Sequence, residues 1–511
     1  MDYPRASGIL LHPTSLPGRF GVGDLGEWAY RFVDFLVETE QSIWQVLPIG
    51  PTSYGDSPYQ SLSTFAGNPL LISLDKLVDE GWLTDGDLAD VPPFPWDRVD
   101  FGAVIDYHNH ILTLAYQRFR DGKTAEQQKS FDAFCIDNAY WLDDFSLFLA
   151  LKNHHGGRPW VEWPRGEALH EAEALTAALE SHADAVEEAR FKQWVFFSQW
   201  LALKAYANER SVRLIGDIPI FVAHDSSDVW ANRDLFYLDE TGNPTVVAGV
   251  PPDYFSETGQ RWGNPLYNWE VMQQQDFNWW IRRIGAALQV VDMLRIDHFR
   301  GFDAYWEIPA TEPTAIIGRW ASAPGFNFFT SLRDTLGGDL AIIAEDLGVI
   351  TPPVRALRDS FGLPGMKVLQ FAWGGRGGEN SFQPHNHVQN CVVYTGTHDN
   401  NTTVGWYNSP EEVDQSIMHH LGSYVNYIIT EPHWTLIRLA LMSVANTAVF
   451  PMQDLLGLGA EARMNTPGQP AGNWSWRLLP EQFDRAPRER LTALTRLYGR
   501  QRDQSEASSS H

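Results

Sequence analysis

The sequence predicts an α/β protein whose 511 residues fold as a (β/α)8 barrel, also called a TIM barrel. Eight short apolar runs can be counted, and several are rich in Val, Ile and Leu without alternation. This is typical of parallel strands that are buried on both faces. Helical stretches lie between the runs, as in a chain of strand-helix units. The runs are Ser7–His12, Ile43–Pro48, Leu214–Val222, Val290–Ile296, Leu340–Ala344, Met366–Phe371, Cys391–Thr395 and Ala448–Met452.

A helix is expected after the first run. Asp24 and Glu27 have the spacing of a capping box, which marks the start of a helix. Phe32, Phe35 and Leu36 then follow at the spacing of one helix face. We therefore expect an amphipathic helix that begins at this box.

Two gaps between the expected strands are much longer than one helix. Residues 52–210 contain several helical patterns, which predicts a mostly helical insertion after the second strand. The pattern of residues 223–285 predicts a loop-rich insertion after the third strand. This insertion carries a loop over residues 249–265. Long loops inside compact domains tend to be functional. Residues 1–511 as a whole are expected to form a single barrel domain. The helical patterns are Ala103–Arg120, Ala125–Leu151 and Ala168–Ala205.

The charge of the chain restricts its partners. Acidic residues outnumber lysine and arginine by 64 to 38, and the formal net charge is -26. Nucleic acid is therefore not expected as a partner, because phosphate binding needs a basic face. A neutral ligand is the simplest partner, and 21 tryptophans provide aromatic faces of the kind on which neutral sugars stack. Adaptation to salt would explain the acidity equally well.

The sequence shows no sign of export or of a membrane anchor. Residues 1–5 contain no basic and apolar leader, and no window approaches the length of a membrane span. The two cysteines, Cys135 and Cys391, lie far apart in the chain, so a disulfide framework is not indicated. We therefore expect a cytoplasmic protein that binds no membrane.

Acidic side chains stand at the ends of four of the expected strands. They are Asp217, Asp297, Glu345 and Asp399. The carboxyl ends of barrel strands meet at one rim, where catalytic side chains lie. One acid at a strand end is more often a cap or a salt bridge, but four around one rim point to chemistry. Clustered carboxylates repel, which can leave one ionised and one protonated at neutral pH, as glycoside cleavage requires.

Arg295 accompanies one of these acids. It lies two residues before Asp297, so on a strand the two side chains point to the same face. A neighbouring guanidinium keeps a carboxylate ionised, which suits a nucleophile. Taken alone, this pair is explained equally well as an ion pair that closes a buried strand.

In their order along the chain, these strand ends resemble the four signature regions of the α-amylase clan. Nearly the whole chain resembles glycoside hydrolase family 77, the amylomaltases or 4-α-glucanotransferases. The signature acids alone would indicate only the clan, whereas the 249–265 loop and the two ends of the chain are specific to the family. The motifs are Gly8–Pro17, Ser57–Gln60, Ala66–Pro69, Gly216–Pro219, Pro251–Pro265, Arg295–Phe299, Ala344–Gly348, Pro364–Phe371, Thr397–Asn400, Arg463–Gly468 and Gly472–Trp474.

The resemblance implies an enzyme that cleaves an α-1,4 bond of a maltooligosaccharide or starch-type glucan. It would transfer the glucanosyl segment to the 4-OH of another glucan or of glucose, by a retaining double displacement. Asp297 would be the nucleophile that forms a covalent intermediate, and Arg295 would hold it ionised. Glu345 would be the general acid and then the base. We expect no cofactor and no metal, and a monomer or weak homo-oligomer.

The resemblance also implies how the glucan is bound. Asp399, the third catalytic acid, would grip sugar hydroxyls together with His398 where the bond is cleaved. The remaining predicted substrate-binding residues are Asp217 and Tyr59 at that subsite, Tyr254, Phe255, Gln260 and Trp262 on the acceptor-side loop, Asn465, and Tyr54 on a secondary glucan-binding surface. For Tyr54, a packed aromatic residue at a turn is at least as good an explanation.

Two features depart from the family pattern. Where the family commonly has His-Asp-Asn-Asp, this chain has Asn400 and Asn401 after Asp399, so one acid beside the site is missing. The N-terminal carbohydrate-binding extension of longer members is also missing. The chain therefore resembles the compact type, and binding of granular starch is not expected.

Four other functions fit parts of the sequence. A non-catalytic glucan-binding protein would share the fold, but all three catalytic acids are present. A plain α-amylase would keep the same acids and lack only the family-specific loop and ends. A phosphorylase or nucleotide-dependent transferase would need a phosphate-binding glycine motif, which Gly374–Gly378 does not match. A metal-dependent barrel hydrolase would use paired histidines, but none of the pairs ends a strand, and adjacent histidines point to different faces. These histidines are His108, His110, His154, His155, His385, His387, His419 and His420.

Overall fold

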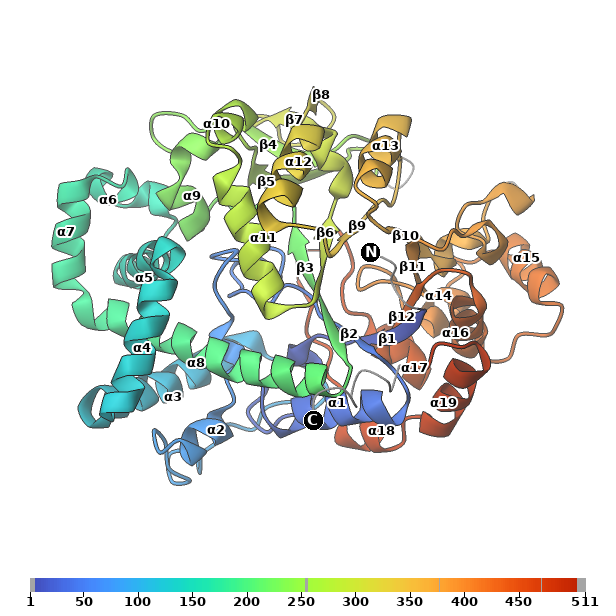
Figure 1. The fold of residues 1–511 in the computed structure, drawn as a ribbon, viewed down its shortest axis with the longest axis horizontal. Helices are drawn as coiled ribbons and strands as arrows, with labels where there is room; N and C mark the ends of the chain where they lie inside the picture. Colours follow the sequence, from blue (N-terminus) through green and yellow to red (C-terminus); the bar gives the residue numbers. More distant parts are fainter. Residues whose placement is uncertain (1–4, 253–255, 376, 470, 503–511) are drawn as a thin grey trace.

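The computed structural model describes residues 5–252, 256–375, 377–469 and 471–502 (Figure 1). Within these ranges, eight parallel strands form one sheet in the order β10-β11-β12-β1-β2-β3-β6-β9. The amide of Ala344 in β9 donates to the carbonyl of Pro364 beside β10 at 2.9 Å, so the two edges of the sheet meet. The predicted (β/α)8 barrel is confirmed. The strands are β1 Ala6–Leu10, β2 Ile43–Gln45, β3 Arg213–Pro219, β6 Met293–Asp297, β9 Ile342–Ala344, β10 Gly365–Val368, β11 Cys391–Tyr394 and β12 Thr447–Pro451.

The barrel strands are buried on both faces, as the apolar runs predict. Every residue of β1, β11 and β12 is buried. At the pairing of β1 with β2, Gly8 faces Ile43. A Cβ atom at Gly8 would lie 2.2 Å from the carbonyl oxygen of Ile43, so only glycine allows the two strands to approach this closely.

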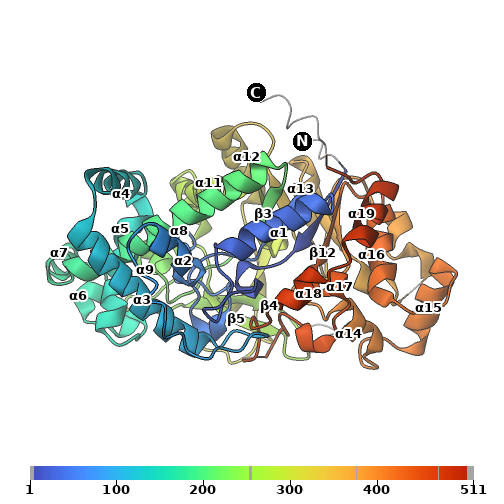
Figure 2. The same ribbon diagram turned by 90° about the horizontal axis from the view of Figure 1, so that it is seen from below.

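Helices cover the outside of the barrel (Figure 2). Contacts run from α1 to α8, from α8 to α11 and from α11 to α12. Between β10 and β11, the described residues form 3₁₀ turns instead of an α-helix, so this unit departs from the regular strand-helix alternation. The covering helices include α1 Glu27–Glu38, α8 Ala183–Glu209, α11 Asn278–Val290, α12 Gly325–Leu336, α13 Pro352–Ser360, α16 Pro432–Met442 and α19 Arg488–Leu497, with α14 Thr403–Asn408, α15 Gln415–Val425, α17 Met452–Leu456 and α18 Pro480–Asp484 near the C-terminal end.

The first helix does not begin with the predicted capping box, so that prediction is wrong. The N-cap of α1 is Gly26, and no side chain caps it. Asp24 is buried, and its Oδ1 accepts from the amide of Gly26 at 2.7 Å, before the helix starts. Leu25 is held by a backbone bond from its amide to the carbonyl of Leu71 at 2.9 Å. Pairing with a distant segment therefore keeps this stretch extended.

Residues between β2 and β3 form helices on one side of the barrel (Figure 1). The longest, α8, serves two regions. Its Phe191 and Trp194 pack on Phe119 of the outer helix α3. Further along, Trp200 donates to the carbonyl of Val290 at the end of α11, at 2.7 Å, so this part of α8 belongs to the ring around the barrel. It remains a proposal that residues 52–210 form one mostly helical insertion. The other helices are α2 Leu74–Asp79, α3 Phe101–Gly122, α4 Ala125–Asp137, α5 Ala139–His154, α6 Arg165–Ala168 and α7 Ala172–Ser181.

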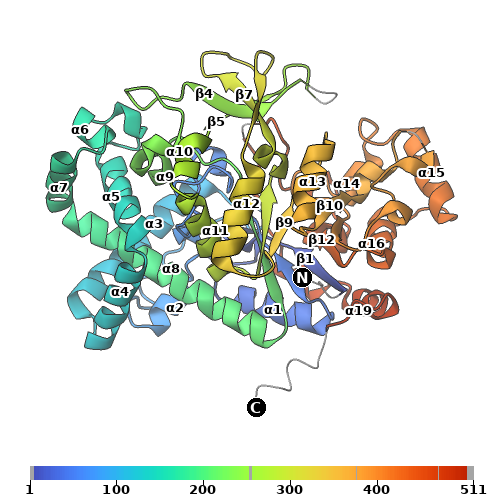
Figure 3. The same cartoon turned by 45° about the horizontal axis from the view of Figure 1, so that its top comes forward.

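Residues 223–285 contain more regular structure than the loop-rich insertion that we expected. Two of their strands join two strands that follow β6 in an antiparallel sheet, in the order β5-β4-β7-β8. This sheet lies above the barrel in Figure 3. The central pair, β4 with β7, lies far apart in the sequence, which explains why a local pattern did not reveal the sheet. The elements are α9 Ser227–Ala231, β4 Val246–Val250, β5 Gln260–Pro265, α10 Trp269–Gln274, β7 Ala304–Pro309 and β8 Arg319–Ser322.

Among the described residues, none of the helices combines the length and the apolar character that crossing a membrane requires.

Candidate active site

A cleft of about 330 Å³ opens where β3, β6 and β11 end. Its walls come from segments far apart in the chain, and several predicted site residues meet there. These are Tyr59, Gln260, Trp262, Asp297, His398, Asp399 and Asn465. Two of the four predicted strand-end acids, Asp297 and Asp399, therefore face one cleft.

Arg295 joins two of the strand-end acids. Asp217 in β3 lies opposite Arg295 in the strand register, and Arg295 Nη1 donates to Asp217 Oδ2. Arg295 Nη2 donates to Asp297 Oδ1 at 2.8 Å. Arg295 and Asp297 therefore point to the same face, as predicted, and one buried guanidinium balances two carboxylates.

Burial changes the proton affinity of Asp217. Its carboxyl is enclosed, and this burial raises its pKa to about 6. Arg295 opposes the shift, while the charge of Asp297 adds to it. Asp217 Oδ1 is buried, and among the described residues it has no hydrogen-bond partner.

Glu345 is held by backbone amides directly after β9. Its Oε2 accepts from the amide of His298 at 2.8 Å, and its Oε1 accepts from the amide of Leu347 at 2.7 Å. Burial, together with the charge of Asp297, raises the pKa of Glu345 to about 8, against the opposing effects of Arg295 and the two amides. A group with this pKa is mostly protonated at neutral pH. Glu345 does not itself line the cleft, but His298 does.

His298 was not among the predicted site residues. It adopts a left-handed backbone conformation with φ of 55°, which turns the chain directly after Asp297. Its ring packs edge-on against Trp262 of β5, with centroids 4.8 Å apart. Burial lowers its pKa to about 4, so the ring is neutral near pH 7. His298 lies in the family motif Arg295–Phe299, but its left-handed conformation leaves no local signal in the sequence.

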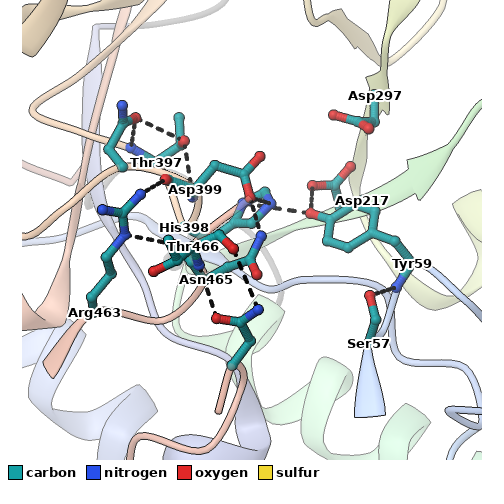
Figure 4. A network of polar contacts seen from close by, with 12 residues as sticks. Ser57, Tyr59, Asp217, Asp297, Thr397, His398, Asp399, Arg463, Asn465 and Thr466 are labelled. Atoms are coloured by element: carbon teal, nitrogen blue, oxygen red, sulfur yellow. Dashed lines mark hydrogen bonds and ion pairs between the residues drawn. The ribbon is translucent and has the colours of Figure 1, made fainter. Parts of the chain in front are cut away.

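Asp399 is fixed by the segment after β12 (Figure 4). Asn465 Nδ2 donates to Asp399 Oδ1 at 2.6 Å, and Arg463 Nη2 donates to the Asp399 carbonyl at 2.7 Å. The amide of Asn465 donates to the carbonyl of His398 at 3.1 Å, and His398 Nε2 lies 3.3 Å from Asp399 Oδ1. Arg463 belongs to a family motif but was not predicted as a site residue.

Tyr59 links the two sides of the cleft. Its hydroxyl donates to Asp217 Oδ2 at 2.8 Å, and its ring stacks on that of His398 with centroids 5.0 Å apart (Figure 4). Trp474 contacts both rings, at 5.8 Å from each, and has a positive φ of 64°. These rings form an aromatic wall beside two carboxylates. Trp474 lies in a quoted motif but was missed as a site residue.

The remaining predicted residues lie on the acceptor side. Trp262 Nε1 donates to Gln260 Oε1 at 3.1 Å within β5, and both side chains line the cleft. Tyr254 and Phe255 lie outside the described residues. Tyr54 is in the 3₁₀ turn Tyr54–Asp56, and its side chain is also outside the described part.

Asn401 departs from the family pattern, and its side chain is directed away from Asp399. Asn401 is buried, and its Nδ2 donates to Glu412 Oε1 at 2.7 Å. Its carbonyl accepts from Gln370 Nε2 at 2.9 Å. An aspartate at this position would bring a second carboxylate against Glu412, so the asparagine suits its neighbour.

A larger cavity of about 650 Å³ lies between the barrel and the helices α5, α8 and α11. Asp217 and Tyr59 contribute to its lining, whereas Asp297, Glu345 and Asp399 do not. The paired histidines do not line the smaller cleft. Because the smaller cleft gathers most of the predicted residues, we take it as the candidate active site.

The comparisons agree with this geometry. The sequence model of glycoside hydrolase family 77, described as 4-alpha-glucanotransferase, matches residues 11–482. The chain is 52% identical over 499 residues to a 4-alpha-glucanotransferase of Thermus thermophilus, covering 97% of this chain and 99% of that protein. It is 51% identical to one from Synechocystis sp., covering 97% and 98%.

A solved structure is similar throughout. The amylomaltase from Streptococcus agalactiae, in complex with acarbose, has a TM-score of 0.94 and 39% identity, over 97% of this chain and 100% of that one. Family, relatives and fold thus agree over nearly the whole length, and the chain belongs to the 4-α-glucanotransferase family, glycoside hydrolase family 77.

Proposed function

We propose that this enzyme cleaves an α-1,4 bond of a maltooligosaccharide or starch-type glucan and transfers the glucanosyl segment to the 4-OH of another glucan or of glucose. One observation carries the proposal. At one rim, Asp297 is paired with a guanidinium, while Glu345 has a pKa raised to about 8. A guanidinium-paired carboxyl group and a proton donor at one rim are the two groups that a retaining mechanism uses.

In the first step, an oxygen of Asp297 attacks the anomeric carbon on the donor side of the scissile bond. Glu345 gives its proton to the glycosidic oxygen as the bond to that carbon breaks. The shortened glucan leaves with the proton, and the remaining segment is esterified to Asp297. Arg295 keeps its bond to Asp297 and balances the second carboxylate, Asp217, at the same time.

In the second step, the 4-OH of an acceptor sugar attacks the same carbon. Glu345, now a carboxylate, takes the hydroxyl proton, and the ester bond to Asp297 breaks. Two inversions restore the α configuration. Water in place of the sugar hydroxyl would give hydrolysis, so the balance depends on which of the two occupies the acceptor side.

We assign glucan binding to the two walls of the cleft. Asp399, held by Asn465 and beside His398, faces sugar hydroxyls with its free oxygen. Asp217 offers the unpaired Oδ1, and Tyr59 offers an aromatic face for the same sugar. On the acceptor side we assign Gln260 and Trp262, with Tyr254 and Phe255 of the adjoining loop, and Tyr54 on a secondary surface.

Three further expectations accompany the assignment. The substrates are neutral glucans, which suits a chain with a net charge of -26. The reaction needs neither a cofactor nor a metal, because two carboxyl groups supply the nucleophile and the proton. A cytoplasmic monomer or weak homo-oligomer remains our proposal.

The test is incubation of the purified protein with maltotriose alone, followed by separation of the products by size. Transfer predicts free glucose together with maltopentaose and longer chains. Glucose and maltose without longer chains would mean hydrolysis and would refute the assignment of the acceptor side. An unchanged substrate would refute the catalytic proposal.

A further inference from the structure

Arg300 lies outside the cleft, yet it bridges two segments that matter for catalysis. It belongs to the 3₁₀ helix Phe299–Phe302 that follows β6. Its Nη1 donates to the carbonyl of Val349, in the turn that follows β9, at 2.7 Å. The side chain of Val349 is 74% exposed, so its burial contributes little to holding the turn. The hydrogen bond from Arg300 therefore fastens this turn to the segment after β6.

Both joined segments hold the carboxyl group of Glu345. The amide of His298, two residues before Arg300, donates to one oxygen at 2.8 Å. The amide of Leu347, two residues before Val349, donates to the other at 2.7 Å. The bond from Arg300 to Val349 thus connects the two amide donors of one carboxyl group.

The tip of the turn is weakly supported by packing, although Leu347 and Ile350 on either side of it are partly buried against the core. Gly348, between Leu347 and Val349, has a φ of 80°, and nothing lies within 4 Å of the position that a Cβ atom would take. Trp320 of β8 covers the guanidinium of Arg300, which lies 4.0 Å from its ring centroid. Such a cation–π contact orients the arginine toward the turn.

We propose that Arg300 is a positioning residue for the acid and base of the transfer reaction, because its bond to Val349 keeps the amide of Leu347 against Glu345. This inference rests on the proposed function. Arg300 touches neither the cleft nor the reacting atoms, and its effect passes entirely through the turn.

The bond has a predictable effect on proton transfer. A hydrogen bond from an amide favours the charged form of a carboxyl group and so lowers its pKa. Of the groups that face Glu345, Asp297 raises its pKa and Arg295 lowers it, and both stay in place when Arg300 is replaced. The adjacent Asp346 faces the other way, toward Arg358 and the amide of Met366. Loss of the Leu347 bond should therefore move the pKa of Glu345 further upward.

The experiment compares Arg300→Met, Arg300→Lys and Arg333→Met with the unaltered enzyme, using maltotriose over a range of pH. Arg333 is the matched control, because its guanidinium also lies over an aromatic ring, that of Phe361, at 5.3 Å. We expect Arg300→Met to lower kcat about tenfold with little change in KM, as for a misplaced catalytic group. The basic limb of the pH profile of Arg300→Met should shift to higher pH. Arg300→Lys should recover part of the lost kcat. Arg333→Met should match the unaltered enzyme in both kcat and pH profile.

An unchanged kcat and basic limb in Arg300→Met would overturn the inference, as would a loss of rate that is equal at every pH and tracks a loss of folded protein. If Arg300→Met does not fold, Trp320→Leu replaces it. Trp320 is 44% exposed, and its removal should cause the same shift to a smaller extent. If the basic limb of the pH profile of Trp320→Leu does not move, the inference is also overturned.

The unaltered enzyme is measured first, so that failure of the proposed function is recognised separately. If it produces no longer chains from maltotriose, the titration of Glu345 is followed by NMR of ¹³C-labelled glutamate carboxyl groups, with Glu345→Gln identifying the signal. An upward shift in Arg300→Met supports the positioning role, and an identical titration refutes it.

Discussion

The two sides of the cleft hold their acids in opposite ways. On the side of β3, β6 and β9, burial raises the pKa of Asp217 to about 6 and that of Glu345 to about 8, although two amides donate to Glu345. On the side of β11, the side chain of Asp399 is 46% exposed, with the amide of Asn465 as a neutral partner. Acids at equivalent strand ends are therefore suited to different tasks. In our proposal, the enclosed Glu345 transfers the proton, whereas the exposed Asp399 forms hydrogen bonds to sugar hydroxyls.

The largest effect is expected for Asp297→Asn, which removes the proposed nucleophile on the side of β3, β6 and β9. Transfer from maltotriose should fall by at least about 10⁴-fold, because an amide cannot form the covalent intermediate. Product analysis measures the rate, and circular dichroism checks that the barrel is intact. Substantial residual transfer would mean that the nucleophile lies elsewhere on the rim.

Glu345→Gln should be the next most severe change, with transfer from maltotriose lowered by about 10³-fold through loss of the proton donor. The first step should survive with α-maltosyl fluoride, whose leaving group needs no proton. The basic limb of the pH profile, expected near the pKa of about 8, should disappear. Equal losses with both donors would contradict the role of Glu345 as an acid.

Asp399→Asn tests the exposed side. The variant should lose about 10²-fold in kcat/KM, the order expected for hydrogen bonds between a charged group and sugar hydroxyls. Its basic limb should stay where it is, since Asp399 does not hold the proton that is transferred. A shift of this basic limb would contradict the proposal that the two sides of the cleft hold their acids for different tasks.

Tyr59→Phe sharpens the comparison, because Tyr59 touches both sides. Loss of the bond to Asp217 should lower kcat/KM about fivefold, the equivalent of about 1 kcal/mol. The pKa of Asp217 should rise above its value of about 6, because the Tyr59 hydroxyl favours the carboxylate. Tyr116→Phe is the control: it removes a comparable bond, to Asp184 at 2.9 Å, in the helices away from the cleft, and should leave activity unchanged.

The smallest expected effect is on stability. The pKa of Glu345 is raised from 4.5 to about 8, so the folded chain keeps a proton that the unfolded chain has released. The stability from this proton is complete below about pH 4.5 and is lost as the pH rises through about 8. The free energy of unfolding should fall by at most about 1.4 kcal/mol for each pH unit in this range. Thermal unfolding of the unaltered enzyme should depend more steeply on pH in this range than that of Glu345→Gln, and equal slopes would contradict the raised pKa.

Local patterns were sufficient to predict the barrel. Each of the eight apolar runs contains or overlaps a strand of the sheet, because strands buried on both faces need continuous apolar residues. The shared face of Arg295 and Asp297 also followed from their spacing alone, since alternate residues of a strand point the same way.

Long-range contacts explain where prediction failed. The sheet β5-β4-β7-β8 is joined by the pairing of β4 with β7, which lie on either side of β6 and far apart in the sequence. The start of α1 was misplaced because the amide of Leu25 pairs with the distant Leu71. His298 and Arg300 were missed because their roles depend on a left-handed turn and on a loop that follows another strand.

By itself, the sequence determined the barrel, the acids that stand at its rim and the family to which their order belongs. Only the tertiary structure decided the surroundings of each acid. Asp297 is paired with a guanidinium, whereas burial and the charge of Asp297 raise the pKa of Glu345 against the opposing effect of its two amide donors. Proton affinity depends on groups brought close by folding, so it follows from the assembled rim and not from any one strand.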